Sequence, residues 1–67
     1  MIDTKAGAPE EVYFEFTALG RNVKVAAIHA ATGIEVAVIG PASAAQADLK
    51  RLALQKLKAR LAAAAKS

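Results

Sequence analysis

Few residues in this chain have the types that catalysis requires. Its 67 residues include no cysteine and a single histidine, His29, and the serines are Ser43 and Ser67. Nucleophilic catalysis requires a nucleophile, a base within hydrogen-bond reach and a group that orients the base. His29 ends a predicted strand with no acidic neighbour on its face, Ser43 precedes a predicted helix, and Ser67 lies at the C-terminus. We therefore expect no catalytic, metal-binding or cofactor-binding residues, and a protein that is not an enzyme.

Paired carboxylates and a helix N-terminus are two further places where chemistry can occur. Glu15 and Glu35 share one face of the predicted sheet, but the predicted register puts Lys24 and Ala26 between them, which favours a solvated cross-strand charge pattern. Residues 40–43 precede a helix N-terminus, where free amides bind anions. They lack the glycines and the lysine of a phosphate loop. We interpret them as a helix cap.

The net charge of +3 is unevenly distributed along the chain. Residues 1–43 carry three cations and five carboxylates, and residues 44–67 carry six cations and one carboxylate, so the net charges are −2 and +5. The basic segment could bind nucleic-acid phosphates through Lys50, Arg51 and Lys58. Cations near a helix C-terminus also complement the helix dipole and keep an alanine-rich helix soluble. We favour this solvated face, and keep weak, sequence-nonspecific nucleic-acid binding as the alternative.

Three runs alternate between apolar and polar residues, the pattern of half-buried β-strands. They are residues 11–19, 23–29 and 34–39. Gly20-Arg21 predicts a two-residue hairpin loop, and residues 30–33 predict a four-residue loop closed by a left-handed Gly33. These loops place Phe16 opposite Val25 and Val25 opposite Val38, so the apolar residues of all three strands share one face. The outer face then carries three larger apolar residues among charged ones: Tyr13, Ile28 and Ile39.

The rest of the domain, from Ser43 onward, is rich in the strongest helix formers. Ser43 and Gln46 match a capping box, which predicts the helix N-terminus. At about 100° per residue, the apolar stripe comprises Ala45, Leu49, Leu52, Ala53, Leu57 and Ala64. Leu54 and Leu61 fall at its margin, and the opposite side comprises Asp48, Arg51, Gln55 and Lys58. The expected core between sheet and helix is formed by Phe14, Phe16, Val23, Val25, Val36, Val38, Leu49, Leu52 and Leu57.

These elements predict an α+β fold, a three-stranded antiparallel meander (β-β-β) followed by one long C-terminal helix packed on one sheet face. The first nine residues contain glycine, proline and no periodic pattern. We therefore expect a disordered tail at residues 1–9 and a single β-β-β-α domain at residues 10–65. A domain of this size buries only about 60% of its unfolded surface. Because neither a disulfide nor a metal compensates, marginal stability and self-association are expected.

Several strings of residues resemble a family of short, uncharacterised alphaproteobacterial proteins. They are EVYFEF at 11–16, NVKV at 22–25, TG with EV at 32–36, GPASA at 40–44 and QADL at 46–49. The likeness covers most of residues 10–61, and members often carry aspartate and proline where this sequence has His29 and Ala30. The resemblance implies no established activity. Some members carry a serine hydroxymethyltransferase label, but that chemistry requires a pyridoxal phosphate pocket in a fold several times this length.

Together these features favour a non-enzymatic protein-interaction module whose partner is another protein or a second copy in a homodimer. The expected interface is the outer face with Tyr13, Ile28 and Ile39, followed by the free strand edges and then by Leu54 and Leu61. No small-molecule substrate is expected. The sequence has no apolar run of the length that a secretion signal or a membrane span needs, and its lack of cysteine fits a reducing compartment. We therefore expect a cytoplasmic protein.

Overall fold

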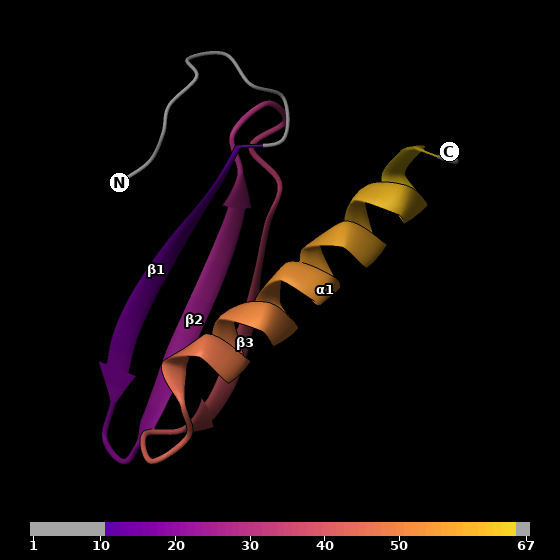
Figure 1. Cartoon of the computed structure of the whole chain (residues 1–67). Helices are drawn as coiled ribbons and strands as arrows, with labels where there is room; N and C mark the ends of the chain where they lie inside the picture. Colours follow the sequence, from indigo (N-terminus) through magenta and orange to yellow (C-terminus); the bar gives the residue numbers. More distant parts are fainter. Residues whose placement is uncertain (1–10, 66–67) are drawn as a thin grey trace.

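The computed structural model describes residues 11–65, which form three strands followed by one helix (Figure 1). The strands are β1 (Val12–Leu19), β2 (Asn22–His29) and β3 (Glu35–Pro41), and the helix is α1 (Gln46–Ala65). The strands form one antiparallel sheet in the order β1-β2-β3. The predicted α+β fold is confirmed, while the tail predicted at residues 1–9 lies outside the described residues.

The strand register is the one that the two loops predict. Phe16 pairs with Val25, and Val25 pairs with Val38, on the face that meets α1. Gly20 and Gly33 both have positive φ, 59° and 74°, the left-handed conformation that glycine adopts without steric cost. The turn residues therefore act as the sequence indicates.

Gly40 lies inside β3, although the alternating pattern predicted a strand that ends at residue 39. The strand continues to Pro41, and Gly40 is buried opposite Val23. A Cβ atom on Gly40 would lie 2.5 Å from Leu49 Cδ2. The missing side chain therefore provides the space in which the first turns of α1 approach the sheet.

The predicted Ser43 cap is wrong, because α1 begins two residues later than such a cap requires. The amide of Leu49 donates to the carbonyl oxygen of Ala45 at 3.2 Å, which makes Ala45 the N-cap residue. Ser43 lies exposed in a turn in which the amide of Ala44 donates to the carbonyl oxygen of Pro41 at 2.9 Å. The chain uses this turn to pass from the sheet to the helix layer, so the serine precedes the helix without capping it.

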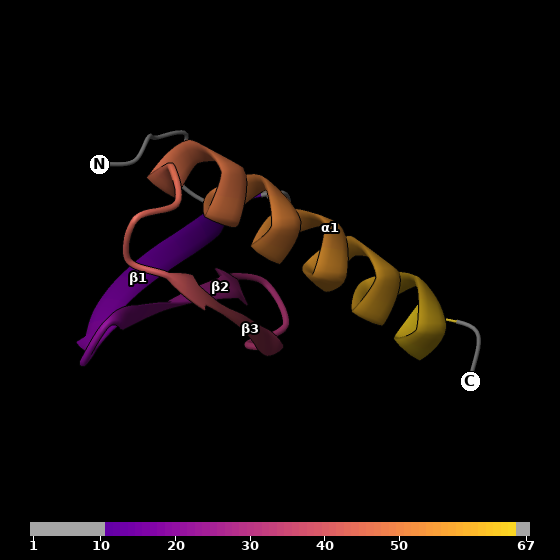
Figure 2. The same cartoon turned by 90° about the horizontal axis from the view of Figure 1, so that it is seen from below.

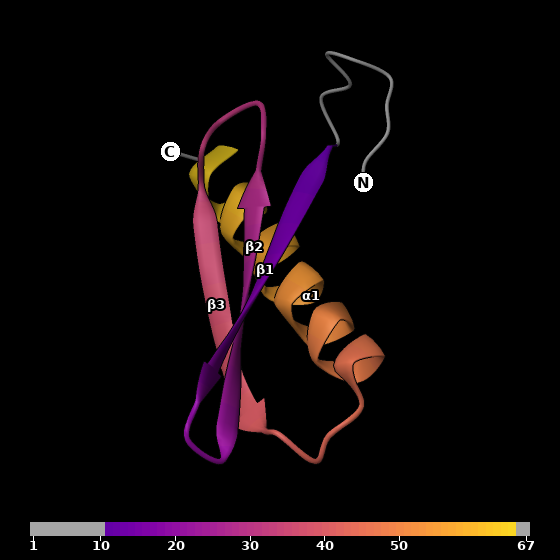
Figure 3. The same cartoon turned by 90° about the vertical axis from the view of Figure 1, so that its left-hand side faces the viewer.

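Within the described chain, α1 lies on one face of the sheet (Figures 2 and 3). It crosses that face obliquely, packs mainly against β2 and β3, and its C-terminal half runs past β3 (Figure 1). The buried core comprises Val25, Ala27, Val36, Leu49, Ala53 and Leu57.

Two residues of the expected core are exposed instead. Phe16 is 40% exposed because it lies on β1, the strand that α1 covers least. Leu52 is 50% exposed because the helix meets the sheet along a line of residues four apart, Leu49, Ala53 and Leu57. The predicted stripe was therefore correct at Leu49, Ala53 and Leu57 and wrong at Ala45, Leu52 and Ala64, which are exposed.

Candidate protein-binding groove

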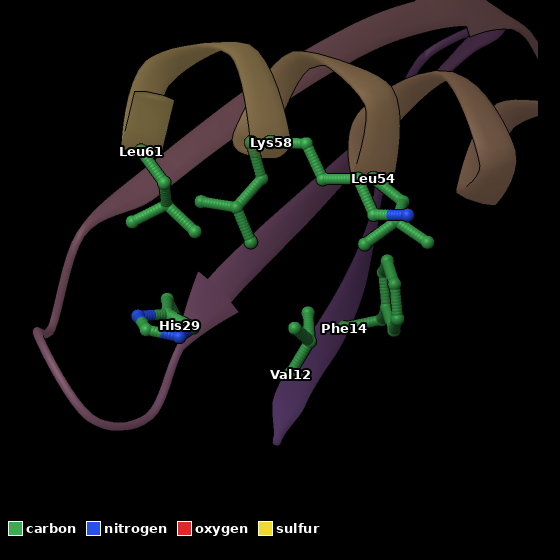
Figure 4. Close-up of a pocket in the computed structure, with 7 residues that line it drawn as sticks. Val12, Phe14, His29, Leu54, Lys58 and Leu61 are labelled. Carbon is green, nitrogen blue, oxygen red and sulfur yellow. The ribbon is translucent and has the colours of Figure 1, made fainter. Parts of the chain in front are cut away.

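An apolar groove of about 440 Å³ opens between α1 and the adjacent ends of β1 and β2. Its volume lies within the range of about 300–1,000 Å³ that is typical of ligand-binding pockets. The groove is lined by Val12, Phe14, His29, Leu54, Leu57, Lys58 and Leu61 (Figure 4).

Strand alternation and helical spacing each supply one wall of the groove. Val12 and Phe14 are two residues apart on β1 and so point to the same face, and Val12 pairs with His29 on β2. Leu54, Lys58 and Leu61 follow the three- and four-residue spacing that places side chains on one flank of a helix. Figure 4 shows the helix side chains facing the strand side chains across the groove.

Two lysines lie along the helix side of the groove. Lys58 lines the groove directly, and the Nζ atom of Lys50 lies 4.9 Å from the centroid of the Phe14 ring, a cation–π distance. No carboxylate is among the residues that line the groove. The rim therefore offers positive charge beside an apolar floor.

His29 takes part in the hairpin loop at one end of the groove. Its Nδ1 atom lies 2.9 Å from the hydroxyl oxygen of Thr32, and the same oxygen accepts the amide of Ile34 at 3.2 Å. The His29 amide also donates to the carbonyl oxygen of Ile34 at 2.8 Å. These bonds hold the imidazole against the loop.

The two edges of the sheet differ. In an antiparallel strand, the backbone N–H and C=O groups of alternate residues point toward the neighbouring strand. The carbonyl oxygen of Ile34 accepts from His29 on β2, so the carbonyl of Ala37, three residues later, points away from β2. That carbonyl accepts a hydrogen bond of 2.7 Å from the Nζ atom of Lys56 on α1. The β1 edge, by contrast, runs for eight residues that contain neither proline nor lysine, the residues that commonly discourage strand addition. The open groove therefore adjoins the less protected edge.

The outer-face candidates occupy separate parts of the sheet. Tyr13 pairs with Ile28, which is half-buried, whereas Ile39 pairs with Lys24 two rows away. Tyr13 and Ile39 are 45% and 63% exposed. Between these rows lies Ala26, which is buried. The exposed apolar side chains of the outer face are therefore separated by a row whose central residue, Ala26, adds almost no exposed area.

The candidate nucleic-acid contacts face different surroundings. Lys50 lies over Phe14. The sequence predicted Lys58 on the side opposite the buried stripe, but it lines the groove instead. Arg51 donates to Asp48 Oδ1 at 2.9 Å in an exposed ion pair. The structure therefore brings Lys50 and Lys58 to the groove and leaves Arg51 neutralised on the outer side of the helix.

Leu54 and Leu61 are the interface candidates that the structure brings together, whereas the groove role of Val12, Phe14 and His29 was not predicted from the sequence. Their alternation on β1 and β2 assigned them to the covered face. Only the path of α1, which leaves that part of the face open, turns them into lining residues.

Residues 11–65 contain no cluster of three or more side chains that could hold a metal ion. Within the same residues, α1 falls short of the length of apolar sequence that a membrane-crossing helix has.

Comparison with known proteins gives one family. No curated protein and no solved structure matches this chain. Residues 9–65 match a family described as a domain of unknown function, DUF6898. Because this match spans nearly all of the 67 residues, the chain belongs to the DUF6898 family.

Proposed function

We propose that this domain is a non-enzymatic protein-interaction module that binds a segment of another protein in the groove between α1 and β1. The observation that carries this proposal is the oblique path of α1, which leaves an apolar groove of about 440 Å³ beside β1. Concave apolar surfaces with a few polar groups are the usual form of binding sites. The proposed setting is the bacterial cytoplasm, which a sequence without cysteine fits.

The groove is a better binding surface than the outer face of the sheet. Phe16, exposed on the same face as the groove, extends the apolar surface along β1. A segment that fills the groove removes aliphatic and aromatic area from water, which contributes about 25 cal/mol per Å². On the outer face, Glu15, Lys24 and Glu35 are interspersed with the apolar side chains, so a partner would have to desolvate charges as well.

The groups that line the groove favour binding over acid–base or nucleophilic chemistry. His29 is the imidazole at its end, where it lies beside Thr32, and the lining contains no serine, cysteine or carboxylate. General acid–base catalysis requires a positioned partner group within hydrogen-bond reach of the reacting atoms. These contacts support a binding role rather than a catalytic one.

Nucleic-acid binding by α1 has weaker support. A phosphate-binding helix presents several cations on one open face, but Lys50 and Lys58 flank an apolar groove, and Arg51 is paired with Asp48. Binding that depends on phosphate contacts also weakens steeply with salt, whereas binding through an apolar groove persists.

The test is a selection of ligands from a random peptide library displayed on phage, with the full chain as target. Selected peptides are then measured against two helix variants, Leu54→Lys in the groove and Leu52→Lys on the other flank of α1. We expect Leu54→Lys to weaken binding at least about tenfold because it places a charge in an apolar site. Leu52→Lys should leave the affinity within about twofold, since Leu52 lies outside the groove.

Two results of this selection would overturn the proposed function. One is a library that yields no binder for the wild-type chain. The other is a set of binders that respond equally to both lysine variants or only to Leu52→Lys. Leu54 is only half-buried and is not part of the core cluster, so Leu54→Lys should remain folded, which thermal unfolding by circular dichroism checks.

A further inference from the structure

We infer that the segment bound in this groove is an amphipathic helix with an acidic flank, supplied by a different protein. This inference rests on the proposed function and adds the conformation and the charge of the partner. It draws on the shape of the space beside α1, on the cations along that side of α1, and on the charge of the chain itself.

The space beside α1 accommodates one side of a second helix. A helix with its side chains is about 10–12 Å across, and neighbouring strands are about 4.8 Å apart, so one helix covers roughly two strands. α1 packs mainly against β2 and β3, so Val12 and Phe14 on the inner face of β1 are only partly buried and Phe16 is exposed. A second helix at the usual interaxial distance of about 8–10 Å would contact Leu54 and Leu61 on one side and Val12 and Phe14 beneath. It would complete a two-helix layer on this sheet.

The cations of α1 indicate which charge the facing side of that second helix should carry. Lys50, Leu54 and Lys58 recur at four-residue intervals and so form a line along the side of α1 that faces the groove. The two lysines are about 12 Å apart along the helix axis, given a rise of about 1.5 Å per residue. Carboxylates about two turns apart on a neighbouring helix match this spacing.

A second copy of this chain does not offer such a helix. The helix in the described residues is α1, and residues 44–67 carry a net charge of +5. Two such helices side by side would bring like charges together, which costs affinity. The acidic residues of the domain, such as Glu15 and Glu35, lie on the outer face of the sheet. Charge complementarity therefore favours a different protein.

Three synthetic peptides of equal length, about five helical turns, test the inference. The first has leucines at i, i+3, i+4 and i+7 spacing with glutamates on both flanks. The second replaces every glutamate with lysine, and the third scrambles the first so that its charge is kept and its apolar face is lost. Each is titrated into the full chain, with fluorescence anisotropy for affinity and circular dichroism for induced helix.

We expect the acidic amphipathic peptide to bind at least about tenfold more tightly than either control and to gain helix on binding. Lys58→Glu should weaken this binding by about tenfold and improve binding of the lysine peptide. Lys24→Glu makes the same change in net charge on the outer face of the sheet. It should alter both affinities by less than about twofold.

Four results would overturn the inference. If the scrambled acidic peptide binds as tightly as the patterned one, binding reflects only charge attraction to the basic helix. Equal binding of the acidic and basic peptides would remove the role of Lys50 and Lys58. Tight binding without induced helix would indicate strand addition to β1. A dimer in sedimentation equilibrium that Leu54→Lys dissociates would show that a second copy fills the groove.

These failures are separable from failure of the proposed function. Library-selected peptides that depend on Leu54 but are neither helical nor acidic would overturn the inference and leave the interaction module in place. A chain that binds neither the selected nor the designed peptides would overturn both.

Discussion

Gly40 and Leu49 are in such close contact that a methyl group on Gly40 would lie 2.5 Å from Leu49 Cδ2. This contact sets where the first turns of α1 meet β3, and therefore how the rest of the helix crosses the sheet. The Leu49 side chain is buried, so it has little space into which it can move.

Gly40→Ala should therefore destabilise the domain by about 1–3 kcal/mol through overpacking. Leu49→Ala alone creates a cavity, which should cost about 2–5 kcal/mol. In the double variant the new methyl group enters that cavity, so the combined loss should be smaller than the sum of the two. Urea unfolding of the four chains measures the coupling, and strictly additive losses would mean that Gly40 and Leu49 do not limit the approach of the helix.

The helix N-terminus offers a stabilising substitution. Ala45 is the N-cap residue but has no side-chain oxygen to accept a helix amide. Ala45→Asp should raise the free energy of unfolding by about 1 kcal/mol, since aspartate both caps the helix and faces the positive end of its dipole. Ser43→Ala should change stability by less than about 0.5 kcal/mol, because Ser43 lies exposed in the preceding turn. A larger loss for Ser43→Ala than gain for Ala45→Asp would place the cap at Ser43.

Two apolar side chains that the sequence assigned to one core should differ in their contribution to stability. Leu57 is fully buried, and Leu57→Ala should cost about 2–5 kcal/mol. Phe16 is 40% exposed, so Phe16→Ala should cost about 1–2 kcal/mol, below the range for a fully buried phenylalanine. Thermal unfolding of both variants compares them directly, and an equal or larger loss for Phe16→Ala would mean that α1 covers β1 in solution.

The hydrogen bond from Lys56 to the Ala37 carbonyl should protect the β3 edge. Lys56→Leu removes this donor, which should cost only about 1 kcal/mol because the bond is exposed to solvent. It also leaves an unpaired acceptor on an edge strand, which invites pairing with another chain. Sedimentation velocity should show concentration-dependent association for Lys56→Leu and much less for Lys66→Leu, which changes the charge equally. If the Lys56→Leu chain remains monomeric, the hydrogen bond from Lys56 to Ala37 has no role in preventing association.

Much of the fold was predictable from the sequence because its turns and its alternation specify one register. Gly20-Arg21 and Gly33 set the loop lengths, and a shift of one residue would have moved Phe16 and Val25 to opposite faces. The same local signals could not locate the helix cap, because Ser43 has the residue type of a cap and only the turn that follows β3 removes it from the helix.

The groove was only half predictable. The helical wheel placed Leu52 in the apolar stripe and Leu54 at its margin, yet Leu52 is half-exposed and Leu54 lines the groove. The direction in which α1 crosses the sheet determines which of the two leucines is exposed. That direction depends on the close approach of Leu49 to Gly40. Such packing between distant residues leaves no periodic signal in the sequence.

Backbone amide shifts measured while a library-selected peptide is titrated into the nitrogen-15-labelled full chain test the groove most directly. The shift changes should concentrate at Val12, Phe14, Leu54 and Leu61, the residues that line the groove on both sides. Amides on the outer face, such as that of Ile39, should change little. Changes centred on Ile39 and its neighbours, with the groove residues unaffected, would contradict the groove as the binding surface.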